Sequence, residues 1–213
     1  MLSTEDDMQH RRQIENVVVL LECNGRNSDL GESVLEKLRE LDAAGPHLHA
    51  GSQIQFGWSI LTLRPEGEGL RVCEPDYLGD ILQLKPTVDV TLDILRQQVP
   101  LLRAVGEDGV DARYDQELAA NPEAFATDDV FLKRDAPEFS EDTGWFLGKL
   151  TDLETARPAD DLESVHVYEL LRRRPALMAI LALPQGYLAI IRGETIAAVF
   201  DPNMKLRLGE YEF

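Results

Sequence analysis

The chain has few cysteines and lacks the long apolar runs that are typical of membrane and secreted proteins. It has two cysteines, Cys23 and Cys73, and their spacing fits no metal-binding motif, so free thiols in a reducing compartment are preferred over a disulfide. No stretch approaches the roughly 18 apolar residues of a membrane-spanning helix. The first residues are too polar for a secretory signal peptide. We therefore expect a cytoplasmic protein that does not enter a membrane.

Basic residues are also scarce. The chain has 21 lysines and arginines against 39 aspartates and glutamates, a formal net charge of −18. Such a surface repels nucleic acid and anionic lipid and attracts basic partners. The excess is concentrated in residues 107–163, which hold 17 acidic and five basic side chains. This segment is either a solvated face that keeps the protein soluble or a docking surface for a basic protein.

Catalytic and cofactor-binding motifs are absent as well. The chain has no Gly-x-Ser-x-Gly turn, no phosphate-binding Gly-x-x-x-x-Gly-Lys and no dinucleotide-binding Gly-x-Gly-x-x-Gly. His47 and His49 could offer two nitrogens to a metal, but no cysteine or third histidine lies nearby. Consecutive residues spread around a helix, so Arg172–Arg174 do not form one phosphate-binding patch. We predict no catalytic residue, no metal, no cofactor and no nucleic-acid partner.

In the first half of the chain, hydrophobic residues follow strand and helix patterns in turn. Val17–Leu21 is a short apolar run typical of a strand, and residues 31–41 have apolar side chains at helical spacing. Residues 53–63 alternate in a way that places Trp58 on the apolar face of a single strand. A second strand around Leu70–Cys73 would complete a hairpin.

Residues 88–102 carry one helical stripe, in which Pro100 predicts a kink or a break into two helices. The following connector contains Asn121-Pro122, the expected domain boundary. Beyond it, strands are expected at 130–132 and 144–150. The later elements are a helix capped by Ser164, a second helix from Pro175 and a closing hairpin over 187–200.

A Gly-Trp pair occurs at a corresponding place in each half, as Gly57-Trp58 and as Gly144-Trp145. Each pair is followed by a polar loop, a helical pattern, a proline and a glycine. This order favours a tandem duplication, although two amphipathic helices can also look alike by chance. The predicted fold class is α+β, with two similar halves, residues 1–122 and 123–213. Each half would be a small, mostly antiparallel sheet packed by a helix pair.

The second Gly-Trp pair stands in the sequence Asp142-Thr143-Gly144-Trp145. Asp142 and Thr143 can bond to nearby backbone in a turn, Gly144 can take a positive φ, and Trp145 can anchor the strand in the core. Asp142 would lie at an exposed corner between loop and strand, where binding residues are often found.

Residues 128–201 resemble a bacterial polymorphic-toxin immunity domain, immunity-protein family thirty-three. The family pattern has a Gly-Trp strand after an acidic residue and Ser or Thr, a Val-x-Val-Tyr helix followed by proline, and Leu-Pro-x-Gly before a last hairpin. In the first half, Gln55 and Phe56 stand where the acidic and hydroxyl residues would be. The residues that match the pattern are Asp142, Thr143, Gly144, Trp145, Pro175, Pro184 and Gly186.

The resemblance implies a non-enzymatic protein that binds and blocks a toxin delivered between bacteria. The acidic surface favours a basic toxin acting in the cytosol, such as a nuclease. The residues expected to bind this partner are Asp142, Thr143, Asp152, Asp160, Asp161 and Glu163, with Phe146 or Leu153 as apolar contacts. The residues expected to shape the fold are Gly57, Trp58, Gly144, Trp145, Pro175 and Gly186.

Two other functions stay open at this point. One is a small hydrolase or transferase with a carboxylate site near Asp142, and the other is an adaptor of a secretion apparatus. A toxin gene next to this one would favour immunity, and a metabolic operon would not. The sequence leaves the oligomeric state open.

Overall fold

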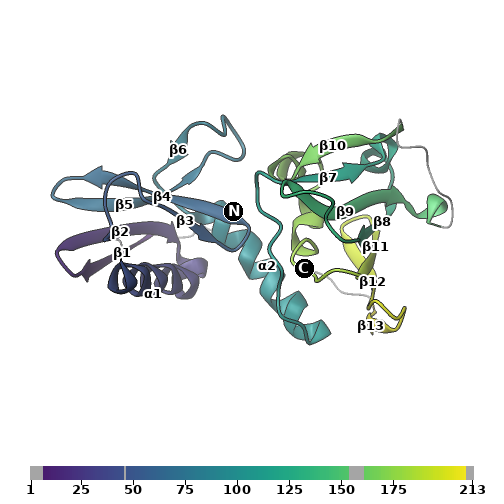
Figure 1. Cartoon of the computed structure of the whole chain (residues 1–213), viewed down its shortest axis with the longest axis horizontal. Coiled ribbons are helices and arrows are strands. Elements are labelled where there is room, and N and C mark those ends of the chain that lie inside the picture. Colours follow the sequence, from purple (N-terminus) through teal and green to yellow (C-terminus); the bar gives the residue numbers. More distant parts are fainter. Residues whose placement is uncertain (1–6, 46, 154–160, 210–213) are drawn as a thin grey trace, which may run out of the picture. The chain divides into compact units, whose positions relative to one another are not determined.

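The computed structural model describes residues 7–45, 47–153 and 161–209. The chain folds into two compact units, Met1–Arg96 and Gln97–Phe213, and each unit has a sheet of its own (Figure 1). Both sheets are mostly antiparallel and helices are few, so the predicted α+β class is confirmed. The division falls at 96/97 and not at the expected 122/123. The reason is that the strand just before the expected boundary pairs within the second sheet.

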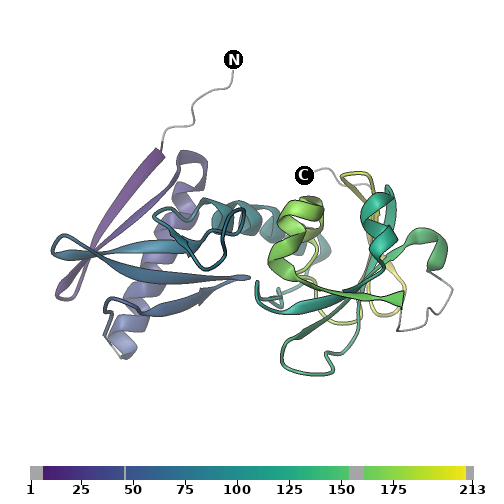
Figure 2. The same ribbon diagram turned by 90° about the horizontal axis from the view of Figure 1, so that it is seen from above.

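The first unit contains a six-stranded sheet in the order β1-β2-β5-β4-β3, with β6 paired to β5. The paired strands are antiparallel except for β2 and β5. Helix α1 (Ser28–Ala44) packs against β1 and β2 along one face of the sheet (Figure 2). The strands are β1 (Asp7–Ile14), β2 (Val17–Asn24), β3 (Gln53–Phe56), β4 (Ser59–Glu66), β5 (Gly69–Pro75) and β6 (Leu84–Lys85).

The core of the first unit joins α1 to the sheet. Val34, Leu35 and Leu38 lie on one face of α1 and are each 1% exposed. They belong to the same buried cluster as Val19 and Leu21 of β2. The helix and the strand predicted from these apolar positions are therefore confirmed.

Both cysteines are buried free thiols. Burial, with a smaller contribution from Asp89, raises the pKa of Cys23 to about 11. Burial also raises the pKa of Cys73. Neither thiol therefore ionises readily to a nucleophilic thiolate near neutral pH.

The Gly57-Trp58 pair forms a turn. Phe56 is paired with Ser59 in the register of β3 and β4, so the two residues between them connect a hairpin. Gly57 has a φ of +59°, and a Cβ here would lie 2.5 Å from Leu95 Cδ2, so any other residue would be strained and would displace the Leu95 side chain. The single strand expected over this segment is wrong, because apolar alternation does not reveal a two-residue turn.

A buried polar network holds the start of helix α2 (Asp89–Val105). The Glu74 carboxylate of β5 accepts hydrogen bonds from the backbone N–H of Val90 at 3.0 Å and of Thr91 at 2.7 Å. The Thr91 hydroxyl lies 2.7 Å from the Ser59 hydroxyl, which in turn lies 2.6 Å from the Tyr77 hydroxyl. Glu74 therefore satisfies backbone donors that a helix N-terminus leaves without partners.

Glu74 makes the stability of the first unit depend on pH. Burial, with a smaller contribution from Asp89, raises the pKa of its carboxyl group to about 7. The folded protein thus keeps this proton to a higher pH than the unfolded chain does. The stabilisation is fully present below about pH 4.5 and is lost as the pH rises to about 7, by up to about 3 kcal/mol. Urea unfolding at pH 5 and pH 8 measures this loss. Glu74→Gln should abolish this dependence of stability on pH. An equal loss in the variant and the unmodified protein would show that another group causes it.

The second unit contains a seven-stranded sheet in the order β10-β7-β9-β8-β11-β12-β13 (Figure 1). Its paired strands are antiparallel except for β7 and β9. The strands expected around 130–132 and 144–150 and the closing hairpin are confirmed. The strands are β7 (Glu117–Ala120), β8 (Asp129–Arg134), β9 (Asp142–Lys149), β10 (Glu163–His166), β11 (Leu188–Arg192), β12 (Thr195–Phe200) and β13 (Leu206–Leu208).

The segment after β10 has less α-helix than expected. Ser164 lies in β10 and caps no helix, because pairing with β7 extends this residue into the strand. The capping box is formed by His166 and Glu169. Pro175 begins a 3-10 helix at a first-turn position, as predicted, but no α-helix follows it. The helical segments here are η5 (Val167–Glu169), α3 (Leu170–Arg173) and η6 (Pro175–Ala179).

Helix α2 continues through Pro100, so the break expected there is not found. Leu92 before the proline and Leu101 after it are both 0% exposed. At 100° per residue they lie on opposite faces of the helix, so Leu101 is not part of the predicted stripe. None of the helices in the described part of the chain is long and apolar enough to cross a membrane. Further 3-10 helices in the described ranges are η1 (Gly25–Asn27), η2 (Pro122–Ala126) and η3 (Leu150–Asp152).

The two sheets do not repeat one topology. In the first sheet the parallel neighbours β2 and β5 are separated in sequence by α1, β3 and β4, whereas in the second β7 and β9 are separated by η2 and β8. Trp58 lies in a turn and donates its indole N–H to the Thr91 carbonyl at 3.3 Å. Trp145 lies inside β9, between two neighbouring strands. The expected tandem duplication, which required equivalent tryptophans, is wrong.

Candidate functional site

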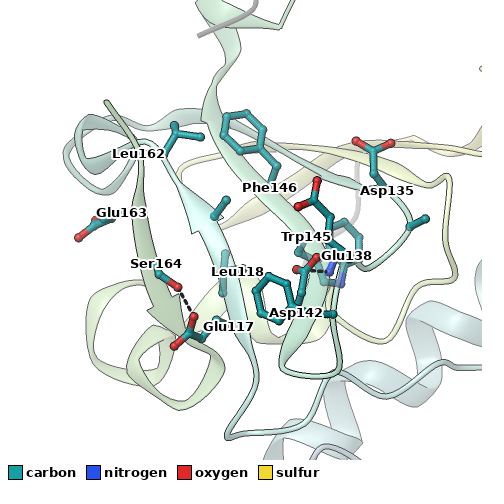
Figure 3. Close-up of a pocket in the computed structure, with 14 residues that line it drawn as sticks. Glu117, Leu118, Asp135, Glu138, Asp142, Trp145, Phe146, Leu162, Glu163 and Ser164 are labelled. Carbon is teal, nitrogen blue, oxygen red and sulfur yellow. Dashed lines mark hydrogen bonds between the residues drawn. The ribbon is translucent and has the colours of Figure 1, made fainter. Parts of the chain in front are cut away.

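A hollow of about 420 Å³ lies on the second sheet, where β7, β9 and β10 meet the loop at residues 135–141. Three strands and one loop contribute to it, although they come from parts of the sequence up to 47 residues apart (Figure 3). We call it the acidic hollow. The carboxylate residues that line it are Glu117, Asp135, Glu138, Asp142 and Glu163.

Strand alternation decides which side chains the acidic hollow exposes. Leu118 and Trp145 are each 1% exposed and belong to the core, so they offer almost no surface. The next residue on each strand, Ala119 or Phe146, faces the opposite side of the sheet. Phe139, in the loop, is 55% exposed. The apolar surface of the hollow therefore comes from Ala119, Ala136, Phe139, Phe146 and Leu162.

Carboxylates flank this apolar surface. Lysine, arginine and histidine are absent from the described residues that line the hollow. Two cations outside the lining pair with it, Lys133 with Asp135 at 2.9 Å and Arg173 with Glu163 at 2.6 Å. Figure 3 shows Glu117 and Glu163 on one side and Asp135, Glu138 and Asp142 on the other, with Leu118 and Phe146 between them.

Asp142 and Thr143 build the wall of the hollow from within. Asp142 Oδ1 accepts the Gly144 N–H at 2.7 Å, and its Oδ2 accepts the Glu138 N–H at 2.8 Å. Thr143 is 1% exposed, and its hydroxyl donates to the Glu117 carbonyl at 2.8 Å. Thr143 therefore joins β9 to β7 and exposes almost no surface, so we leave it out of the binding surface proposed below.

Gly144 is the residue of this turn that tolerates substitution least. Its φ is +74°, and a Cβ would lie 2.2 Å from the carbonyl oxygen of Asp135. Gly193 also has a positive φ, +57°, but nothing lies within 4 Å of its Cβ position. We expect Gly144→Ala to cost about 3 kcal/mol, from left-handed strain plus overlap, and Gly193→Ala about 1 kcal/mol, from strain alone. Chemical denaturation of both variants measures the difference, and equal losses would show that the overlap relaxes freely.

Arg134 of β8 fixes the hollow from the core side. Its guanidinium lies 5.6 Å from the centre of the Trp145 ring, whose indole N–H donates to the Leu181 carbonyl at 3.1 Å. Burial lowers the pKa of Arg134 to about 10, so the group is still charged at pH 7. It is thus a buried cation held by backbone dipoles. It donates to the carbonyl groups of Val110, Thr143, Leu181 and Leu183.

The arginine run at Arg172–Arg174 forms no single patch, as its spacing predicted. Arg173 pairs with Glu163 and lies 3.5 Å from the centre of the Phe125 ring. Arg174 is buried, and burial lowers its pKa. It joins residues 124–128 to the turn between β11 and β12 by donating to the carbonyl groups of Ala124, Thr127, Asp128 and Gly193.

The structure brings together some of the predicted partner-binding residues and separates others. Asp142 and Glu163 both line the acidic hollow. Asp152 does not, since it lies in η3, which follows the opposite end of β9. Asp161 is exposed but is not part of the lining, and Asp160 lies outside the described residues.

Of the two predicted apolar contacts, Phe146 lines the hollow and Leu153 does not. The acidic bias of residues 107–163 pointed to this region but not to individual side chains. Phe139, an aromatic residue in the acidic loop at residues 135–141, was the additional sequence signal that could have indicated a binding surface. The lining residues that the sequence did not single out are Glu117, Asp135, Glu138 and Phe139.

The other candidate groups have structural explanations. Gly186 has a φ of +89°, and its N–H donates to the Arg134 carbonyl at 2.7 Å, which explains the turn before β11. His47 is 84% exposed at the side chain and lies 3.5 Å from Asp42. Within the described ranges, no three His, Cys, Asp or Glu side chains are grouped in a way that could hold a metal.

The second unit is therefore a small α+β domain with a hollow on its sheet, lined by apolar side chains and by carboxylates. A family model described as Imm33-like domain matches residues 97–202, almost the whole of this unit. The C-terminal half of the chain belongs to this family, and the resemblance to an immunity-protein family is confirmed. Searches of curated proteins and of solved structures found no match.

Proposed function

We propose that this protein is a non-enzymatic immunity protein that binds and neutralises a basic bacterial toxin in the cytoplasm. The observation that carries the proposal is the acidic hollow, which lies wholly within the matched residues 97–202. Its lining combines five carboxylates with aromatic and aliphatic surface. Acidic groups speed the encounter with a basic protein, and apolar contacts then slow its dissociation.

The binding surface we propose differs from the one expected from sequence. It consists of Glu117, Asp135, Glu138 and Glu163 around Phe139 and Phe146, with Asp142 holding the loop in place. Asp152 and Asp161 contribute long-range charge outside the hollow, a smaller effect that salt screens.

An enzyme that uses the carboxylates near Asp142 is the rival function. Both oxygens of Asp142 already accept backbone N–H groups, and the Glu117 carboxylate accepts the Ser164 hydroxyl at 2.5 Å. These bonds support a structural role for Asp142 and a fixed orientation for Glu117. A substrate turned over by the purified chain, with activity lost in Asp142→Asn, would favour the enzyme.

Co-expression tests the proposal. The full chain is produced in a susceptible bacterium together with the toxin candidate of the neighbouring gene, and growth is compared with that of cells holding an empty vector. We expect growth to be restored and the two proteins to purify as one complex. A folded chain that neither protects nor binds would contradict this function, and a metabolic operon around the gene would point to the enzyme.

A further inference from the structure

We propose that the acidic hollow binds an arginine side chain of the toxin. This inference rests on the proposed function and specifies the chemistry of its binding site. The occupant must carry positive charge, because the described lining has five carboxylates and no basic side chain. It must also cover apolar surface, because the lining includes Phe139, which is 55% exposed, and the partly exposed Phe146.

Glu138 is the carboxylate best placed to receive the cation. It is exposed at the rim, next to Phe139 in sequence, and the structure gives its carboxylate no partner among the described residues. Across from it, Glu117 and Glu163 border the other side of the hollow (Figure 3). Among the described side chains, Asp135 pairs only with Lys133, which is 50% exposed, and such exposed pairs are weak.

Arginine suits this surface better than lysine. Its planar guanidinium can stack on an aromatic ring while its N–H groups bond to a carboxylate at the ring's edge, and it is more weakly hydrated than an ammonium group. A lysine ammonium is a strongly hydrated point charge that gains less from the two phenylalanines.

The same domain already contains this arrangement. The Arg173 guanidinium lies 3.5 Å from the centre of the Phe125 ring and bonds to Glu163 at 2.6 Å. Glu163 is also part of the hollow's lining. Phe139 with Glu138 offers an incoming arginine the pair of groups that Phe125 and Glu163 offer Arg173.

Short peptides test this inference without the toxin. The full chain, labelled with nitrogen-15, is titrated at constant ionic strength with acetyl-Gly-Arg-Gly-amide and with its lysine and citrulline counterparts. We expect the arginine peptide to shift the backbone amide signals of Phe139, Gly144 and Phe146. The lysine peptide should bind about fivefold more weakly. The neutral citrulline peptide should leave the signals in place.

Two variants locate the site. Phe139→Ala and Glu138→Gln should each weaken arginine-peptide binding, whereas Glu40→Gln, at an exposed glutamate of α1, should leave it unchanged. Absence of shifts, shifts elsewhere on the protein, or equal binding of arginine and lysine would overturn the inference. Co-expression with the toxin measures protection independently of the peptide titration. A failed titration with full protection would reject the arginine site and leave the immunity function standing. A successful titration without protection would keep the arginine site and reject the immunity function.

Discussion

Replacing Arg134 with methionine is expected to lower the free energy of unfolding of the second unit by about 3–5 kcal/mol. The substitution leaves the carbonyl groups of Val110, Thr143 and Leu183 without the guanidinium donor, at a cost of about 1–3 kcal/mol for each group that stays unsatisfied. The Leu181 carbonyl keeps the hydrogen bond from the Trp145 indole. It also removes the cation over the Trp145 ring. Part of the loss is offset because the charged guanidinium is itself costly to bury, as its lowered pKa shows.

Two further variants distinguish this explanation from a general effect of losing an arginine. Arg192→Met removes a guanidinium whose side chain is 65% exposed and 3.9 Å from Asp129, and should change stability by less than about 1 kcal/mol. Arg134→Lys keeps the charge but lacks the planar set of five donors, so its loss should be intermediate. Urea denaturation followed by tryptophan fluorescence measures all three. A loss below 1 kcal/mol for Arg134→Met would mean that water or a neighbouring group satisfies the carbonyls.

Strands and the long helices were the elements best predicted from sequence. The apolar run of β2 and the helical spacing of α1 are local signals, and each was sufficient to predict its element from sequence. The segment around Gly57 was not predicted correctly, because a hairpin turn interrupts an alternation that continues unchanged on both sides. A glycine next to a tryptophan could signal either a turn or a strand, and only the pairing of Phe56 with Ser59 decides between them.

The domain boundary could not be read from composition because it depends on strand pairing. Asn121 and Pro122 have the residue types of a linker, yet Asn121 is 1% exposed and its side chain accepts the Glu123 N–H at the start of η2. The preceding strand β7 lies between β9 and β10, which both follow it in sequence. Non-local pairing of this kind overrides the local turn signal.

The candidate site was predicted as a region and not as a set of residues. The acidic bias identified the segment that contains the hollow, and Asp142 and Glu163, two of the residues expected to bind a partner, both line it. Glu117 joins them only because β7 runs parallel to β9, which pairs Glu117 with Asp142 across 25 residues of sequence. Thr143 shares the motif but faces the core, since successive residues of a strand point to opposite sides.

Reversing two charges at the rim of the acidic hollow should slow association with the toxin by about 10- to 100-fold at low salt. The variant is Asp135→Lys with Glu138→Lys, both at exposed positions of the loop. Its control is Glu36→Lys with Glu40→Lys on α1, in the first unit, which changes the net charge by the same amount. The hollow variant should also flatten the dependence of the association rate on salt, since fewer charges remain to be screened.

Phe139→Ala should act on the other rate constant. Phe139 exposes apolar surface in the acidic hollow, so removing it should leave the association rate unchanged and raise the dissociation rate about 30-fold or more, as the loss of a central aromatic contact does. Stopped-flow or surface plasmon resonance measurements with the purified toxin, at two salt concentrations, separate the two rate constants. Equal slowing by the two double variants would show that only overall charge matters, and unchanged kinetics in all three would place the toxin on another face of the protein.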